Sequence, residues 1–345
     1  MGHHSIPIAG TVRYPDSVAL LRQVRPIARL PPQHELGPLM WGEPEMAASS
    51  NNRPALVPER ATSFFTADGV RLGGTWFLPL EGTPVLAAIV ITCGGGIPAR
   101  FYHRLARFLA ARGAAVLTFD YRGIGESRRG SLKEMRTGVE TWGAADLDAA
   151  FMLARQSYPD AQFGAIAHSV GALLLGAAQD ARRLSKIVFL GPHTGYWRDY
   201  ARRWRLPLYL AWHVLMPAAT RIVGYFPGKT LGMGEDLPPQ VAMDWANRRQ
   251  PELVRGRDDR RGIAAILGMY HEVRAPTLAL SASDDAFAPP GAAKRLLALY
   301  PNALVTHRLV TPASVNRRRV GHLGYLSQSA GDEIWTMASA WLLTV

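Results

Sequence analysis

The sequence predicts an α/β protein in which a mostly parallel sheet carries helices on both faces and a helical insertion above one edge. From Thr62 onward, short apolar runs alternate with amphipathic stretches, the pattern of parallel strands joined by helices. One connection late in the chain is far longer than a plain crossover needs. With 345 residues, 48% of them hydrophobic, the chain is long enough to bury a large core.

Composition and hydrophobic periodicity divide the chain into four segments. Residues 1–58 are rich in proline and weakly periodic, which predicts an extended or partly disordered arm. We expect the first part of the α/β core over 59–191, a helical cap over 192–275, and the second part of the core over 276–345.

The elements of the core follow one another from a predicted hairpin about Asp68–Gly69. Apolar runs predict buried strands, and stretches with helical periodicity between them predict helices, one closed by Gly113 and one stopped by Pro159. The strands are "VLAAIVITC", "AAVLTFD", "QFGAIAH", "KIVFLG" and "PTLALSA", and the helices are "RFYHRLARFLAARG", "TWGAADLDAAFMLARQSYP" and "VGALLLGAAQDARR".

The long connection lies between the strands ending near Leu190 and beginning near Thr277, a gap of about 86 residues. It is rich in aromatic residues, and the alternatives are a peripheral decoration or a cap over a ligand pocket. Open α/β sheets bind ligands at the carboxyl ends of their strands, so we favour the cap. The residues expected to line its pocket are His168, Trp197, Trp204 and Trp212.

Composition narrows the classes of partner. The formal net charge is +12, yet only four of the 39 basic residues are lysines, and the arginines are scattered. Since no basic helix or nucleic-acid fold signature is present, we expect no nucleic-acid partner. The charge is compatible with an anionic substrate or a membrane surface, neither of which it requires. Oligomeric state is not predicted.

The composition also argues against disulfides, an all-cysteine metal site and a signal peptide. The single cysteine, Cys93, excludes an internal disulfide framework and an all-cysteine metal site. The opening "MGHHSIPIAG" lacks a charged and then apolar signal pattern, so we expect a cytoplasmic protein.

Ser169 is the strongest candidate nucleophile. It directly follows the strand "QFGAIAH" and precedes a helix, which is the context of a nucleophile elbow. The residues two before and two after such a serine must be small, and here they are Ala167 and Gly171. Glycine is usual at both positions, so this chain departs from the pattern at Ala167. The alternative is that Ser169 is merely a small core residue.

Candidate residues for the base and the acid lie C-terminal to Ser169. A nucleophilic serine needs a histidine base and an acid that orients it. "LALSASDDAFAPP" ends a strand in Asp284 and Asp285, and "RRRVGHLGYL" places His322 between glycines. The alternatives are a helix N-cap or turn for the aspartates and a capping role for the histidine.

These motifs together resemble a known superfamily. The segment Asp120–Ser127, "DYRGIGES", is similar to the D-x-R-G-x-G-x-S segment of α/β-hydrolases. "GIPARFY", "GYFPGKTLGMGEDLP" and "GHLGYL" resemble more narrowly a bacterial family close to the lysophospholipase and serine aminopeptidase (S33-like) branch. The resemblance spans Thr62 to the C-terminus.

The resemblance implies an eight-stranded sheet of the α/β-hydrolase fold, with Ser169 as nucleophile, His322 as base and Asp285 as acid. In relatives the acid commonly precedes a proline by four residues, as Asp285 precedes Pro289. Asp284 is then expected to accept backbone N–H groups in the turn.

Acyl transfer also needs donors for the developing oxyanion. Three glycines, 94–96, follow the strand "AAIVITC" at the place where superfamily members carry an oxyanion-hole amide. We expect the Gly95 amide to serve, with Gly96 as second choice, together with the Val170 amide beside the nucleophile. The alternative is a plain strand-ending turn.

No cofactor or metal is expected. "GIGESRR" has Arg128 where a dinucleotide loop needs its third glycine, and "GYFPGKT" has one residue too few for a phosphate loop. No pair of histidines has metal-ligand spacing.

The sequence thus predicts a serine hydrolase that cleaves carboxylic esters with apolar acyl groups, a carboxylesterase or lipase-like enzyme. An acyltransferase or an aminopeptidase could use the same residues. A non-catalytic binding protein has no need of all three triad members.

Overall fold

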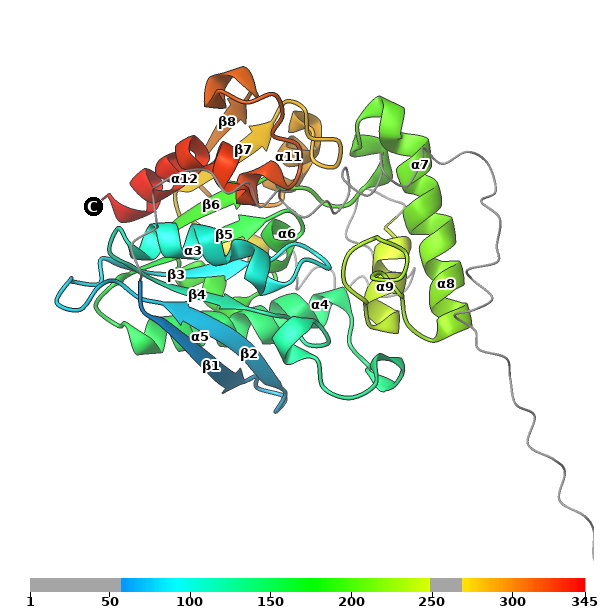
Figure 1. The fold of residues 1–345 in the computed structure, drawn as a ribbon, viewed down its shortest axis with the longest axis horizontal. Helices are drawn as coiled ribbons and strands as arrows, with labels where there is room; N and C mark the ends of the chain where they lie inside the picture. Colours follow the sequence, from blue (N-terminus) through cyan, green and yellow to red (C-terminus); the bar gives the residue numbers. More distant parts are fainter. Residues whose placement is uncertain (1–56, 249–268, 345) are drawn as a thin grey trace, which may run out of the picture.

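An eight-stranded, mostly parallel sheet forms the centre of the molecule (Figure 1). The structure is a computed structural model that describes residues 57–248 and 269–344. The strand order is β1-β2-β4-β3-β5-β6-β7-β8, and only β2 runs antiparallel to its neighbours. The predicted α/β-hydrolase fold, with eight strands, is confirmed. The strands are β1 Glu59–Phe65, β2 Arg71–Phe77, β3 Ala87–Thr92, β4 Ala114–Phe119, β5 Gln162–His168, β6 Lys186–Leu190, β7 Thr277–Ala282 and β8 Val305–Val310.

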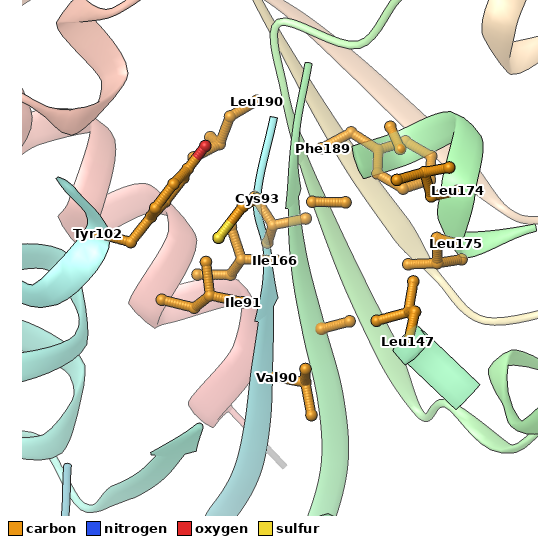
Figure 2. Close-up of a cluster of buried hydrophobic side chains, with 14 of the residues drawn as sticks. Val90, Ile91, Cys93, Tyr102, Leu147, Ile166, Leu174, Leu175, Phe189 and Leu190 are labelled. Atoms are coloured by element: carbon orange, nitrogen blue, oxygen red, sulfur yellow. The ribbon is translucent and has the colours of Figure 1, made fainter. Parts of the chain in front are cut away.

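Helices cover both faces of the sheet. Helices α3 and α12 pack together on one face, and α5 and α6 lie on the other (Figure 2). A π-helical turn, Trp142–Leu147, joins α4 to α5. The α-helices are α3 His103–Ala110, α4 Val139–Thr141, α5 Asp148–Ser157, α6 Gly171–Leu175, α7 Arg205–Leu210, α8 Met216–Val223, α9 Pro239–Ala246, α11 Pro290–Leu297 and α12 Gln328–Leu343.

The central strands are buried on both faces, which explains why they are almost continuously apolar. Every residue of β3 is buried. Because side chains alternate along a strand, Ile91 points toward Tyr102 on one face and Val90 toward Leu147 on the other (Figure 2). The core therefore has two layers, and the sheet between them is held rigidly enough to position loops at its edge.

Helices α7, α8 and α9 lie in the connection between β6 and β7, to one side of the sheet (Figure 1). A π-helical turn, Ala211–Leu215, joins α7 to α8, and α8 packs against α9. The predicted cap, 192–275, is described except for 249–268. The predicted arm, 1–58, lies outside the described residues apart from its last two.

One helix in the described part of the chain, Arg202–Val223, is long and apolar enough to cross a membrane, with a mean hydropathy of 1.2 over an 18-residue window. In this fold 44% of that window is buried. Its inner side includes Trp212 and Met216, which line the pocket described below.

One predicted helix is shorter than its sequence pattern. The stretch after Ser169 predicts a helix continuing to about Arg183, but α6 ends at Leu175. The hydroxyls of Tyr270 and Tyr300 donate to the carbonyl oxygens of Leu173 and Ala172. These carbonyls would otherwise accept from the next helical turn, so the two tyrosines complete the hydrogen bonding of a helix that stops early.

The segment after β4 ties three parts of the fold together through Arg122. Its Nε lies 2.6 Å from Asp146 Oδ1, and its Nη1 lies 2.6 Å from Asp68 Oδ2 in the β1–β2 turn. The Asp146 side chain is fully buried. Because an unpaired buried charge is costly, this ion pair fixes the β4 exit loop against the helix that carries Asp146.

We predict that Arg122→Met lowers the free energy of unfolding by about 3–5 kcal/mol, because it leaves the buried Asp146 without its charged partner. Urea denaturation measures this loss. The matched control is Arg182→Met, because Arg182 pairs with Glu272 on the surface, where an ion pair contributes less than about 1 kcal/mol. Equal losses in both variants would contradict the account of Arg122.

Candidate active site

Ser169 sits in a strained turn between β5 and α6. Its φ is +58°, a left-handed conformation that non-glycine residues rarely adopt. The Ser169 N–H donates to the Leu190 carbonyl oxygen at 2.9 Å, which ties the turn to the end of β6. Strain of this kind costs roughly 1–3 kcal/mol and persists where surrounding structure enforces it.

Gly171 is required by close packing of the turn. A Cβ atom there would lie 2.7 Å from the Thr92 carbonyl oxygen and 2.8 Å from that of Cys93. On the other side, Ala167 is fully buried in β5 and pairs with Thr92 of β3 and Phe189 of β6. The departure from glycine at Ala167 is therefore accommodated within the sheet.

Three side chains from separate loops form a continuous chain of hydrogen bonds. Ser169 Oγ lies 2.8 Å from His322 Nε2, and His322 Nδ1 lies 2.8 Å from Asp285 Oδ2. Ser169 follows β5, Asp285 follows β7, and His322 lies between β8 and α12. The geometry is that of a hydroxyl that can donate to a histidine oriented by a carboxylate.

The Asp285 carboxylate is stabilised in its ionised form. Burial opposes ionisation, but the His322 imidazole and the N–H groups of Phe287 and Ala288 outweigh it and hold the pKa of Asp285 below its usual value. Those two amides donate to Oδ1 at 2.8 and 2.9 Å, leaving Oδ2 for His322. The carboxylate is thus fixed in both charge and orientation.

The neighbouring Asp284 faces the backbone instead. Its two carboxylate oxygens accept from the N–H groups of Val320 and Gly321 at 2.9 and 3.0 Å. Asp284 was expected to accept N–H groups within its own turn, but its donors belong to the distant loop before His322. Asp284 thereby anchors the loop that carries His322.

The amides expected to bind an oxyanion lie around Ser169. Gly95, Gly96 and Val170 all line the same pocket as Ser169. A Cβ added to Gly95 would lie 3.2 Å from Val170 Cγ1, so the two loops are in contact. Within the described residues, neither the Gly95 nor the Val170 N–H donates to a protein acceptor, which leaves both amides available.

His168 was expected to line the pocket, but it is not among the lining residues. It is fully buried, and its Nε2 lies 3.0 Å from the carbonyl oxygen of His322. Its Nδ1 lies 2.9 Å from the Tyr102 hydroxyl, which itself accepts from the Gly94 N–H. Burial, then the nearby His322, lowers the pKa of His168 to about 3. His168 is the last residue of β5, and its imidazole supports the backbone of His322 rather than facing the pocket.

An apolar pocket opens above Ser169, between the sheet edge and the cap. Trp212 lines it as expected, but Trp197 and Trp204 are not among its lining residues. Trp197 packs against Tyr209 instead, with ring centroids 4.9 Å apart. The lining residues are Gly95, Gly96, Ile97, Val139, Trp142, Ser169, Val170, His193, Trp212, Met216, Met233, Leu237, Val241, Trp245, Phe287, His322 and Leu323.

His193 is a site residue that the sequence reasoning missed. It is buried in the loop after β6, and its Nε2 lies 2.9 Å from Ser169 Oγ. The position of His193 in the sequence could have indicated this, because "GPHTG" follows β6, the strand that pairs with β5. The carboxyl ends of parallel strands lie at the same edge of a sheet. Burial, followed by the nearby His322, lowers the pKa of His193 to about 3.

Among the residues that the structure describes, no group of three or more His, Cys, Asp or Glu side chains could hold a metal ion. Cys93 is fully buried, and burial raises the pKa of its thiol well above the usual value. Cys93 is therefore a poor candidate for a thiolate nucleophile.

Comparison with known proteins supports this fold. A family model described as serine aminopeptidase, S33, matches residues 83–311. No curated protein matches the chain in sequence.

Solved structures of hydrolases share the fold at low identity. An esterase from Pyrococcus furiosus is 16% identical, with a TM-score of 0.54 over 85% of this chain and 94% of that one. An esterase from Exiguobacterium antarcticum is 13% identical, with a TM-score of 0.53 over 83% and 100%. A monoacylglycerol lipase from Paleococcus ferrophilus is 16% identical, with a TM-score of 0.50 over 79% and 98%.

We predict that stability falls on acidification because His168 and His193 are neutral in the folded protein. Both have folded pKa values of about 3, below the unfolded value of about 6.5. Between these values the unfolded chain binds the extra protons, so each histidine lowers the free energy of unfolding by about 1.4 kcal/mol per pH unit as pH falls.

Denaturation of the wild type and His193→Gln between pH 6 and 4 checks this. In the variant, the free energy of unfolding should change with pH less steeply than in the wild type, by about 1.4 kcal/mol per pH unit, because one of the two histidines is absent. Identical slopes would mean that His193 takes up a proton in the folded state.

Proposed function

The chain belongs to the serine aminopeptidase S33 family of α/β-hydrolases, and we propose that it hydrolyses carboxylic esters through an acyl-enzyme on Ser169. The observation that carries the proposal is the chain of 2.8 Å contacts from Ser169 Oγ through His322 to Asp285. It lies at the base of an apolar pocket, with available amides beside the hydroxyl.

In the acylation step, His322 Nε2 takes the proton of Ser169 as Oγ attacks the ester carbonyl carbon. Asp285 balances the charge of the resulting imidazolium. The carbonyl π electrons move to oxygen, and the amides of Gly95 and Val170 stabilise that oxyanion, with Gly96 as a second choice of donor. The tetrahedral intermediate collapses when the alcohol leaves with the proton from His322.

Deacylation uses the same groups with water as the nucleophile. His322 takes a proton from water, the hydroxide adds to the acyl carbon, and the Gly95 and Val170 amides again bind the oxyanion. The bond to Ser169 Oγ then breaks, Oγ regains its proton from His322, and the carboxylic acid is released.

Pocket chemistry favours an apolar acyl group. Most lining side chains are aliphatic or aromatic, including Trp142, Trp212 and Trp245. An Asp or Glu side chain in the pocket could bind the α-ammonium group of an aminoacyl substrate. Among the described lining residues there is none. This absence supports an esterase over an aminopeptidase for this member of the family.

We predict that a fluorophosphonate probe labels Ser169, and that the purified protein hydrolyses p-nitrophenyl esters of apolar acids faster than aminoacyl p-nitroanilides. Ser169→Ala should abolish both labelling and hydrolysis, because it removes the attacking oxygen, while circular dichroism stays unchanged. Labelling that persists in the alanine variant would rule out Ser169 as the nucleophile. Exclusive activity on aminoacyl anilides would favour the aminopeptidase alternative.

The two adjacent aspartates provide a matched pair for the acid. Asp285→Asn should lower kcat by about 10³- to 10⁴-fold, because an amide neither holds the required tautomer of His322 nor balances its charge. Asp284→Asn should mainly lower stability, by about 1–2 kcal/mol, because one of its two backbone donors loses its acceptor. Steady-state kinetics and thermal denaturation of both variants measure this, and the reverse kinetic ranking would assign the acid to Asp284.

A further inference from the structure

Ser169 Oγ lies within hydrogen-bond distance of two imidazoles, one more than the proposed mechanism uses. Besides His322, His193 places its Nε2 2.9 Å from Oγ. The His193 and His322 rings contact each other at a centroid distance of 5.4 Å and an angle of 74°. His193 is 2% exposed, and its ring forms part of the pocket wall beside the hydroxyl.

Hydrogen bonding fixes the position of the His193 proton. The Gly195 N–H donates to His193 Nδ1 at 3.0 Å, so Nδ1 carries a lone pair. With a pKa of about 3, caused first by burial and then by His322, the ring is neutral at neutral pH. A neutral imidazole has one N–H, which must therefore be at Nε2 and point at Ser169 Oγ.

The same reasoning gives His322 the opposite orientation. Its Nδ1 faces the ionised Asp285 carboxylate and donates to it, and in a neutral ring this leaves the lone pair on Nε2. Ser169 Oγ thus donates its proton to His322 and accepts one from His193. Within the described residues no carboxylate forms a hydrogen bond or ion pair with His193. The charge of Asp285 favours a His193 cation, but burial and His322 outweigh it, so the role of His193 differs from that of a second base.

We propose that His193 is a further catalytic residue, whose Nε2–H stabilises the negative charge that develops on Ser169 Oγ. The inference rests on the proposed acyl-enzyme mechanism. As the Oγ proton passes to His322 Nε2, an Oγ lone pair forms the bond to the acyl carbon, and the bond from His193 strengthens because its acceptor gains charge. His193 keeps its proton throughout.

The same contact acts in deacylation. When the bond between the acyl carbon and Oγ breaks, its electron pair returns to Oγ, which receives a proton from His322. The His193 N–H stabilises the departing oxygen until that proton arrives. A fixed donor also limits rotation of the Ser169 hydroxyl, so its proton stays directed at His322.

The test compares His193→Gln with His193→Met. The two side chains are close in size and flexibility, but only glutamine offers an N–H donor. We expect His193→Met to lower both kcat on a p-nitrophenyl ester and the rate constant of fluorophosphonate labelling by about 10- to 100-fold, with KM nearly unchanged. His193→Gln should restore most of each rate, and equal losses in both variants would overturn the proposal.

Labelling separates this proposal from the mechanism on which it rests. Absence of wild-type labelling at Ser169 would reject the acyl-enzyme mechanism itself. Normal wild-type labelling with an equally fast His193→Met variant would reject only the role of His193. If His193→Met does not fold, ¹⁵N NMR of the wild-type imidazoles decides: a proton on Nε2 of neutral His193 is expected, and a proton on Nδ1 would overturn the proposal.

Discussion

The left-handed backbone of Ser169 is the constraint on which the site depends. Its φ of +58° turns the chain sharply from β5 into α6, and the surrounding structure enforces the turn. The Ser169 N–H is held by the end of β6, and the absent side chain of Gly171 lets α6 begin against the carbonyl groups at the end of β3. Because these strands are buried on both faces, the sheet holds the hydroxyl at its carboxyl edge.

The loop that carries His322 is held at this edge by backbone contacts as well as by the Asp285 side chain. Asp284 binds the N–H groups just before His322, and His168 binds the His322 carbonyl group. Asp285 then orients the imidazole itself. Each of these groups stands at or just beyond the end of a strand, so the positions of strands β5 and β7 determine the distance between Ser169 and His322.

Much of this arrangement could be predicted from sequence, because it depends on local order. Alternating strands and helices predicted the sheet, and chain order pointed to Ser169, to Asp284 or Asp285, and to His322. The choice of Asp285 rested on the resemblance to α/β-hydrolases. The early end of α6 depends on Tyr270 and Tyr300, about 100 residues or more away in sequence, and no local pattern reveals it. The pocket walls and the contact of His193 with Ser169 likewise arise from side-chain directions after folding.

Formation of an acyl group on Ser169 is the central step of the proposed ester hydrolysis. Its most direct test is mass spectrometry of protein quenched in acid during turnover of p-nitrophenyl butyrate, followed by peptide mapping. We expect a butyryl group on the peptide that contains Ser169, bonded to the Ser169 hydroxyl oxygen. Turnover with the butyryl group on another residue, or with no acylated peptide at any time of quenching, would contradict it.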